Sequence, residues 1–534
     1  MGRKFSAWFL LPTIGNTVYL CIFFTLIFKT GSGLLGDGDT GYHIRAGEYI
    51  LENRSIPGHD IFSFLTPPLK WTLHEWLSEV LMALIHNVFG LTGIVIFFAL
   101  LIASIHLLLY NALRQTGSDV ILATLVASLA VTSSSTHWLA RPHIFSLALL
   151  LVWYLLLDAF QYRNRNTLKY LPPLMLLWVN LHGGYIMGLV LLAIYIAGNA
   201  ISYWTARPSL AGEGLAKAKK LAFIGIVCLI TAMLNPEGYH ILRFPFEVTS
   251  NRFLMDNVQE FLSPNFHDRL PFKYMLLLLV GALAVSRRGV NAIELALIVL
   301  FTYMALYSAR YITLFAVILA APLLRLTEGL LADLPARYQN FLRVRSLNLA
   351  AVEARTKGYF WPIFGVVLVV FLASVGAIRF EFDRERFPVA AVEFLKKERI
   401  TGNMFNDDEI GDYLIYAAWP QYRVFMDGRS DMYGAKIGGD YLTVTRVLPG
   451  WQDLLKKYDI EWIIVNTGAS LATVLKVHLD WHLIYDDSVA SIFVKKNLRN
   501  QLLIEKYNPV GHEEKNTKKI HQPRAVVSHA FVLS

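Results

Sequence analysis

Long apolar stretches separated by short polar segments make up most of the first 378 residues. A helix that crosses a bilayer needs about 20 apolar residues, so each stretch of roughly this length predicts a transmembrane helix. The first stretch, at 8–28, has no Ala-x-Ala cleavage site after it, and we interpret it as a retained first helix rather than a signal peptide. The pattern predicts about eleven spans, the others lying at 91–113, 119–134, 144–160, 168–181, 184–204, 219–234, 272–285, 290–306, 309–326 and 359–378.

The pattern changes after residue 380. Short β-like runs now alternate with helical stretches, which predicts a small α/β domain; the runs are 424–426, 462–465 and 491–494, and the helical stretches are 389–397 and 451–458. Residues 498–534 are polar and basic with few apolar anchors, which predicts a flexible tail. The expected division is a membrane domain at 1–380 with a first outer loop at 30–90, an α/β domain at 381–497, and the tail.

Lysine and arginine cluster in alternate polar segments. If the spans alternate in direction, these clusters share one side, which the positive-inside rule makes cytoplasmic; they are Arg3, Lys4, Arg114, Arg163, Arg165, Lys169, Lys217, Lys219, Lys220, Arg287, Arg288 and the segment 343–357. The N-terminus is then cytoplasmic. With an odd number of spans, the α/β domain is extracytoplasmic, together with the loops 30–90, 135–143, 182–184 and 235–271.

Composition supports a membrane protein. Hydrophobic residues make up 55% of the 534 positions and charged residues only 17%, which is unlike a soluble domain. The formal net charge of +9 invites a nucleic-acid partner, but its basic residues lie between apolar stretches and indicate topology instead. Cys21 and Cys228 both fall in apolar spans, so neither a disulfide framework nor a Cys-x-x-Cys metal site is available.

The positions of the ionisable residues distinguish between classes of function. Few lie in the middle of a predicted span, whereas an ion-coupled transporter or lipid flippase normally needs some at mid-depth. Many acidic and histidine residues map to the outer loops instead. This distribution favours chemistry at the outer membrane surface, although a non-catalytic scaffold that presents the α/β domain to partners stays open.

The first outer loop holds the most concentrated group of such residues, Asp37, Asp39 and His43. Apolar residues recur at helical spacing from Ile44 to Leu51 and predict a weakly amphipathic surface helix. Asp39 would stand at its start, one turn before His43 on the same face. A helix cap explains Asp39 without function; a carboxylate that takes a proton from an acceptor hydroxyl is the functional alternative.

The order of these elements resembles that of bacterial GT-C glycosyltransferases: a first span, an acidic residue directly after it, and then an amphipathic surface helix. Further motifs look like those of an uncharacterised branch; they are IPGHDIFS at 56–63, WTLHEWL at 71–77, ARPH at 140–143, LWVNLHGG at 177–184, LNPEG at 234–238 and DGR at 427–429. The resemblance covers most of the chain. It implies a polytopic α-helical fold with a C-terminal extracytoplasmic domain, in a bacterial cytoplasmic (inner) membrane.

The resemblance also implies a reaction, inverting transfer of a hexose or pentose from a polyprenyl-phosphate donor to a lipid, glycan or protein acceptor. The catalytic base would be Asp39, or Asp37 if the register differs. A sugar phosphate already has a good leaving group, so the site needs cations that hold the departing phosphate. Arg141 and Arg310 are candidates, because a guanidinium binds phosphate bidentately and stays charged; for each, an interfacial arginine is the alternative.

Other outer-side residues are candidates for lining the same cleft. His74 and Glu75 form a polar pair that fits acceptor or donor contact, a structural hydrogen-bond network, or a divalent metal. His143, Asn180 and His182 lie at span ends, where polar groups that satisfy helix termini are equally expected. No cofactor or dedicated metal site is assigned, and a divalent metal stays open.

The α/β domain offers less chemistry. Turn geometry explains Asp427-Gly428 without function, and no glycine-rich phosphate loop opens a helix. We therefore expect an accessory domain, no soluble nucleotide-sugar donor, and no nucleic-acid partner.

Overall fold

The computed structural model describes residues 10–115, 118–205, 208–356 and 358–507. They divide into two compact units, which we call the membrane unit and the α/β unit. The membrane unit contains the chain up to Leu35, Ala46–Ile56 and Thr72–Glu381. The α/β unit contains Gly36–Arg45, Pro57–Trp71 and the chain from Phe382 onward. The sequence did not predict that two segments of the first outer loop group with the C-terminal part of the chain.

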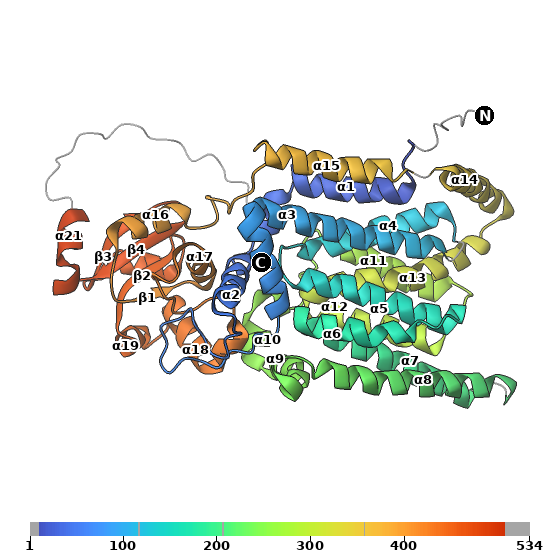
Figure 1. The fold of residues 1–534 in the computed structure, drawn as a ribbon, viewed down its shortest axis with the longest axis horizontal. Helices are drawn as coiled ribbons and strands as arrows, with labels where there is room; N and C mark the ends of the chain where they lie inside the picture. The colour runs from blue at the N-terminus through green and yellow to red at the C-terminus, as the bar shows by residue number, and fades with distance from the viewer. Residues whose placement is uncertain (1–9, 116–117, 206–207, 357, 508–534) are drawn as a thin grey trace. The chain divides into compact units, whose positions relative to one another are not determined.

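The membrane unit is helical (Figure 1). Its helices are α1 (Ile14–Phe28), the second half of α2 (Asp39–Asn53), α3 (Trp76–Gln115), α4 (Val120–Ser134), α5 (His143–Arg163), α6 (Leu171–Leu181), α7 (Ile186–Thr205), α8 (Pro208–Ala232), α9 (Phe244–Ser250), α10 (Arg252–Asn257), α11 (Phe272–Val285), α12 (Ala292–Tyr307), α13 (Ile312–Ala332), α14 (Ala336–Arg355) and α15 (Phe360–Ser374). Neighbouring helices pack lengthwise, as α1 does with α3 and α15, and α7 with α8.

Every predicted span coincides with a helix. Among the described residues, five helical segments are long and apolar enough to cross a membrane, namely Trp76–Gln115, Val120–His137, His143–Arg163, Gly183–Trp204 and Ala309–Ala332. A sixth span results if α14 and α15, bent by 65°, are taken together. Helices α1, α11 and α12 are apolar but shorter. The chain is an integral membrane protein, and a total of about eleven crossings stays a prediction.

Helix α3 begins earlier in the chain than the sequence predicted. Residues 76–89 were predicted to belong to that loop, but they form the first part of α3, and the helical conformation breaks only at Gly90, where φ is 62°. A positive φ strains any residue with a Cβ atom, so glycine is the residue that permits this break.

The α/β unit is built around one four-stranded sheet. Its strands are β1 (Asn403–Asn406), β2 (Ile460–Asn466), β3 (Trp481–Asp486) and β4 (Ala490–Lys495), in the order β1-β2-β4-β3. β1 pairs with β2 in parallel, and the other two pairs are antiparallel. Its helices are α16 (Val389–Glu398), α17 (Asp408–Ala418), α18 (Ser430–Thr445), α19 (Trp451–Lys457), α20 (Ser470–Leu475) and α21 (Gln501–Tyr507).

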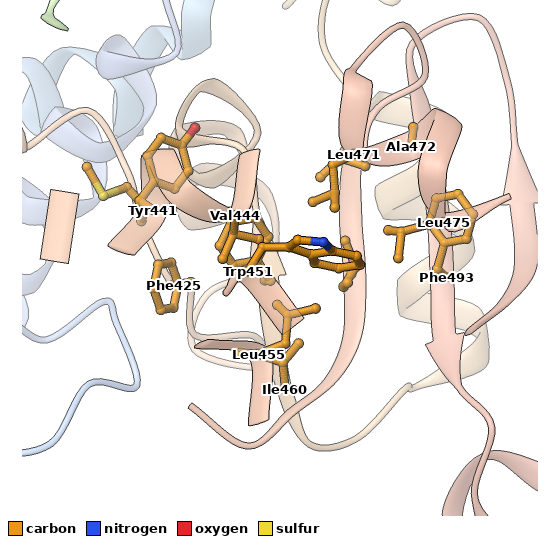
Figure 2. Close-up of a cluster of buried hydrophobic side chains, with 14 of the residues drawn as sticks. Phe425, Tyr441, Val444, Trp451, Leu455, Ile460, Leu471, Ala472, Leu475 and Phe493 are labelled. Carbon is orange, nitrogen blue, oxygen red and sulfur yellow. The ribbon is translucent and has the colours of Figure 1, made fainter. Parts of the chain in front are cut away.

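Both faces of the sheet are covered, since β2 is buried from Ile460 to Val465. Side chains alternate between the two faces of a strand. Ile463 and Val465 therefore share one face and belong to a single hydrophobic cluster. Figure 2 shows other members of this cluster, including Phe425, Trp451 and Phe493. Trp462 points to the opposite face of the sheet, where its ring packs edge-on against the Tyr422 ring with 5.4 Å between the ring centres.

Several expectations for this region are confirmed and two need correction. The predicted strands at 462–465 and 491–494 are β2 and β4, and the predicted helices are α16 and α19. The predicted strand at 424–426 is wrong, because the chain there makes only an isolated parallel bridge from Val424 to Ser63. Residues 501–507 of the expected tail form α21; its remainder, 508–534, lies outside the described residues.

Candidate functional site

Asp37 and Asp39 have different roles at the start of α2. The Asp39 backbone N–H donates to Asp37 Oδ1 at 2.9 Å, and α2 begins at Asp39. The helix expected after the first span is thus confirmed, although most of its residues from Asp39 to Ile50 are buried, and its capping carboxylate is Asp37 rather than Asp39. His43 follows one turn after Asp39, as predicted, and its ring lies 4.2 Å from that of Tyr42.

The Asp39 carboxylate approaches two groups that lie far along the chain. A Cβ atom at Gly428 would lie 2.1 Å from Asp39 Oδ1 and 3.1 Å from Asp412 Oδ2. Asp412, on α17, accepts a hydrogen bond from the Gly428 N–H at 2.8 Å through Oδ1. Burial raises the pKa of Asp412 well above its usual range, and the Asp39 and Asp427 carboxylates add to this effect.

Next to this pair lies a buried ion network. Arg429 donates to Asp427 at 2.7 Å and to Asp60 at 2.8 Å, and Tyr433 donates to Asp427 at 2.6 Å. The Arg429 guanidinium lies 4.4 Å from the centre of the Trp71 ring. Asp427-Gly428-Arg429 was expected to be an ordinary turn, but it ties the segment Pro57–Trp71 to the rest of the α/β unit.

A second group of charges lies in the membrane unit and contains both predicted phosphate-binding arginines. Glu260 Oε1 lies 3.2 Å from Arg310 Nη1, and Glu260 Oε2 lies 3.7 Å from Arg141 Nη1 and 3.8 Å from His137 Nε2. Burial opposes ionisation of Glu260, but Arg310 and Arg141 outweigh it and lower its pKa to about 2. Two guanidiniums and one carboxylate leave this cluster with a net positive charge, which suits an anion.

The loop that carries Glu260 is held in place by its backbone. The Ser308 hydroxyl donates to the Glu260 carbonyl oxygen at 2.9 Å, and the Ala309 N–H donates to the Leu262 carbonyl oxygen at 2.9 Å. Arg310, in the short 3₁₀ helix Ala309–Tyr311, also lies 4.6 Å from the centre of the Phe261 ring. The backbone pairing therefore brings Glu260 and Arg310 together, although they are distant in sequence.

His74, Glu75 and His182 form a third group, also in the membrane unit. Glu75 Oε1 lies 3.2 Å from His182 Nε2 and 3.6 Å from His74 Nε2. The Gly184 N–H donates to His182 Nδ1 at 2.8 Å, so the proton of neutral His182 sits on Nε2 and faces Glu75. Burial lowers the pKa of His182 to about 4, against the opposing charge of Glu75. A divalent metal at the His74–Glu75 pair stays a prediction.

Asn180 and His143 are tied to helix ends. Asn180 Oδ1 accepts from Trp76 Nε1 at 2.9 Å and from Asn235 Nδ2 at 3.2 Å, which joins the ends of α6 and α8 to the start of α3. His143 Nε2 lies 3.0 Å from the His137 carbonyl oxygen, at the start of α5. These contacts fit the structural alternative for both residues.

Two residues enter the candidate site that the sequence did not single out. Asp412 sits in an ordinary amphipathic helix, and nothing in its local sequence marks it. Asp60 lies within the motif at 56–63, yet its partner Arg429 is 369 positions away. Glu260 was recognisable only as one of several outer-side acidic residues.

The fold and these groups define a class, a multi-helix membrane protein that carries an α/β unit and has clusters of acidic, basic and histidine side chains outside its predicted spans or at their ends. No protein-family model and no curated protein matches the chain. Solved structures do. The apo oligosaccharyltransferase of Archaeoglobus fulgidus is similar with a TM-score of 0.53 and 11% identity, over 93% of this chain and 76% of that one.

Two further structures are also similar. The oligosaccharyltransferase AglB of Archaeoglobus fulgidus, in complex with an inhibitory peptide and a dolichol-phosphate, has a TM-score of 0.52 and 11% identity over 90% of this chain and 74% of that chain. ArnT from Cupriavidus metallidurans, bound to undecaprenyl phosphate, has a TM-score of 0.45 and 13% identity over 91% and 98%. At such identities the similarity concerns the fold. The expected GT-C-like membrane fold is confirmed at that level.

Proposed function

We propose that this protein is a glycosyltransferase that moves a sugar from a polyprenyl-phosphate donor to an acceptor, at the outer face of a bacterial inner membrane. The observation that carries the proposal is the pair of arginines, Arg141 and Arg310, gathered on one carboxylate in a membrane unit of this fold. A fold neighbour, AglB of Archaeoglobus fulgidus, is described in complex with a dolichol-phosphate and a peptide. That complex supports a lipid-linked donor here.

The proposed reaction is a single displacement with inversion. An acceptor oxygen attacks the anomeric carbon of the sugar, and the bond from that carbon to the phosphate oxygen breaks. The acceptor proton passes to Asp39, which acts as general base. Arg141 and Arg310 stabilise the negative charge that develops on the departing polyprenyl phosphate. Asp37 is the weaker candidate for the base, because its carboxylate already caps α2.

His74, Glu75 and His182 suit orientation of the sugar or the acceptor. Neutral His182 donates toward Glu75 and orients its carboxylate, which can accept hydrogen bonds from the hydroxyl groups of a sugar. His43, one turn after Asp39 on α2, is proposed as a further contact to the substrate. The class of acceptor stays open between lipid, glycan and protein.

The proposal is tested by measuring turnover of lipid-linked sugar donors. Purified full-length protein is incubated with a panel of polyprenyl-phosphate-linked hexoses and pentoses and an extract of candidate acceptors, and release of polyprenyl phosphate is followed. We expect turnover of at least one donor, and a loss of about 10²-fold or more in Asp39→Asn. The absence of turnover with every donor would contradict the proposal and favour a scaffold. An unchanged rate in both Asp39→Asn and Asp37→Asn would show that the assignment of the base is wrong, even if the protein is a transferase.

A further inference from the structure

We infer that Asp412, on α17 of the α/β unit, is a positioning residue that holds Asp39 through a hydrogen bond from a protonated carboxyl group. This inference rests on the proposed role of Asp39 as base. It changes the role of the C-terminal part of the chain, which the sequence led us to treat as an accessory domain. The C-terminal part of the chain would supply one of the two carboxyl groups on which the chemistry depends, and both groups lie in the α/β unit.

The two carboxyl oxygens of Asp412 have different neighbours. Oδ1 accepts from the Gly428 N–H at 2.8 Å. Oδ2 lies 3.1 Å from the place where a Cβ atom of residue 428 would sit, and Asp39 Oδ1 lies 2.1 Å from that same place. One oxygen therefore accepts from a backbone donor, and the other lies near the same point beside Gly428 as Asp39 Oδ1. This division fits a carboxylic acid that accepts through one oxygen and donates through the other.

Close packing between α17 and the start of α2 maintains this arrangement. A Cβ atom at Gly38 would lie 2.7 Å from Asp412 Cβ, and one at Gly41 would lie 2.7 Å from Tyr416 Cβ. Both distances are too short for a side chain, so glycine is needed at both positions. Arg45 Nε also donates to the Tyr416 carbonyl oxygen at 2.8 Å, which fastens the next turn of α2 to the end of α17.

The charges around Asp412 favour its neutral form. Asp37 and Asp39 face it from the start of α2, and Asp427 faces it from the loop before α18. The Arg429 guanidinium is engaged by Asp427 and is therefore committed to another carboxylate. Neighbouring carboxylates in a buried site do not all ionise, and burial here raises the pKa of Asp412 well above its usual range. A proton retained on Asp412 lets Asp39 stay ionised.

The arrangement has a consequence for pH dependence. Below the pKa of Asp412, its O–H orients Asp39, and the pair carries a single negative charge. Above that pKa, the hydrogen bond is lost and two anions repel each other. We therefore expect transferase activity to decline on the alkaline side as Asp412 loses its proton.

The experiment compares two substitutions at this position in the full-length protein. Asp412→Asn keeps one acceptor and one donor in the same places, so it rescues transfer to within about tenfold of wild type and removes the alkaline decline. Asp412→Ala keeps neither group and lowers the rate about 100-fold. Gly428→Ala places a methyl group against Asp39 and also lowers the rate, whereas Gly439→Ala, where a Cβ atom meets nothing within 4 Å, does not.

Infrared spectra give a readout that does not need activity. The difference spectrum of wild type minus Asp412→Asn should show a protonated-carboxyl C=O band at neutral pH that belongs to Asp412. If Asp412→Asn loses the band while the wild type shows no measurable transfer, the inference about Asp412 stands and the proposed function is overturned. An unchanged band, an Asp412→Asn variant as inactive as Asp39→Asn, or an Asp412→Asn profile with the same alkaline decline would overturn the inference itself.

Discussion

Arg141 and Arg310 share the single carboxylate of Glu260, so a phosphate that enters this cluster meets two guanidiniums whose charge is half neutralised. A guanidinium contacts two phosphate oxygens at once, whereas the ammonium of lysine is a point charge. We expect Arg310→Lys to weaken binding of undecaprenyl phosphate about tenfold and Arg310→Gln to weaken it further. Displacement of a fluorescent lipid phosphate from protein in nanodiscs measures both changes.

Arg243→Gln is the matched control, because Arg243 is an exposed arginine of the predicted outer loop 235–271, and its guanidinium lies 5.7 Å from the centre of the Tyr239 ring. It removes the same charge without touching the cluster. Equal weakening by Arg243→Gln and Arg310→Gln would mean that only the general positive charge of the surface matters, and the role of Arg310 in phosphate binding would be lost.

Asp407, between β1 and α17, gives a pH prediction for stability. Burial raises its pKa from 3.8 to about 7, and Asp408 and Glu409 add to the effect. The folded state then keeps a proton that the unfolded chain releases, so this carboxyl favours folding at low pH and its contribution declines as pH rises toward about 7. Asp407→Asn, which retains an acceptor for the Asn466 N–H, should remove this decline.

Hydrogen exchange of the amides in β2 checks this, with wild type and variant compared at the same pH. We expect slower exchange in Asp407→Asn than in wild type at pH 8 and little difference at pH 5. Faster exchange in the variant at both values would show that the charge of Asp407 stabilises the unit.

At the scale of elements, α2 depends on a close approach to α3. A Cβ atom at Gly47 would lie 2.0 Å from the Glu79 carbonyl oxygen and 2.8 Å from Ala83 Cβ. Gly47→Ala must push α2 away from α3, and overpacking of this kind costs about 1–3 kcal/mol. We expect a lower thermal unfolding temperature of the purified protein and, because Asp39 starts the same helix, lower transferase activity.

Gly58→Ala provides the comparison, since a Cβ atom at Gly58 meets nothing within 4 Å. It should leave both unfolding temperature and activity near wild type. If Gly47→Ala unfolds at the same temperature as Gly58→Ala, the packing of α2 on α3 is looser than described.

The elements differ in how far their sequence determines them. Apolar length locates the spans of the membrane unit but not the first part of α3 or the helices α9, α10 and α14, and the spacing from Ile44 to Leu51 locates α2. β2 was predicted from its short apolar run, although it is buried on both faces and lacks polar alternation. β3 was missed, and the apolar run at 424–426 was mistaken for a strand although it pairs only through the bridge from Val424 to Ser63.

The candidate site could be predicted only in part, because several of its contacts join residues that are far apart in the sequence. Asp39 and Arg141 could be chosen because they follow or precede a predicted span, and Arg310 because it lies at the end of one. Asp412 could not, because its role arises from glycines at 38 and 428 that let distant backbone segments meet. Likewise, no sequence rule pairs Glu260 with Arg310, whose proximity depends on the backbone contact from Ala309 to Leu262.

At the scale of the whole molecule, the account depends on the side of the membrane that each loop occupies. Lipid-linked transfer at the outer face requires the segment that leads to Asp39 to be extracytoplasmic and the basic loop around Arg287 and Arg288 to be cytoplasmic. Gly33 and Gly289 report on these two segments, because both are exposed and a Cβ atom at either one meets nothing within 4 Å.

The deciding measurement is labelling of single cysteines with a membrane-impermeant thiol reagent in intact cells, after Cys21 and Cys228 have been replaced. The account predicts that Gly33→Cys is labelled in intact cells, whereas Gly289→Cys is labelled only after the membrane is permeabilised. Labelling of Gly289→Cys in intact cells, with Gly33→Cys protected until permeabilisation, would place the acidic segment in the cytoplasm and contradict it.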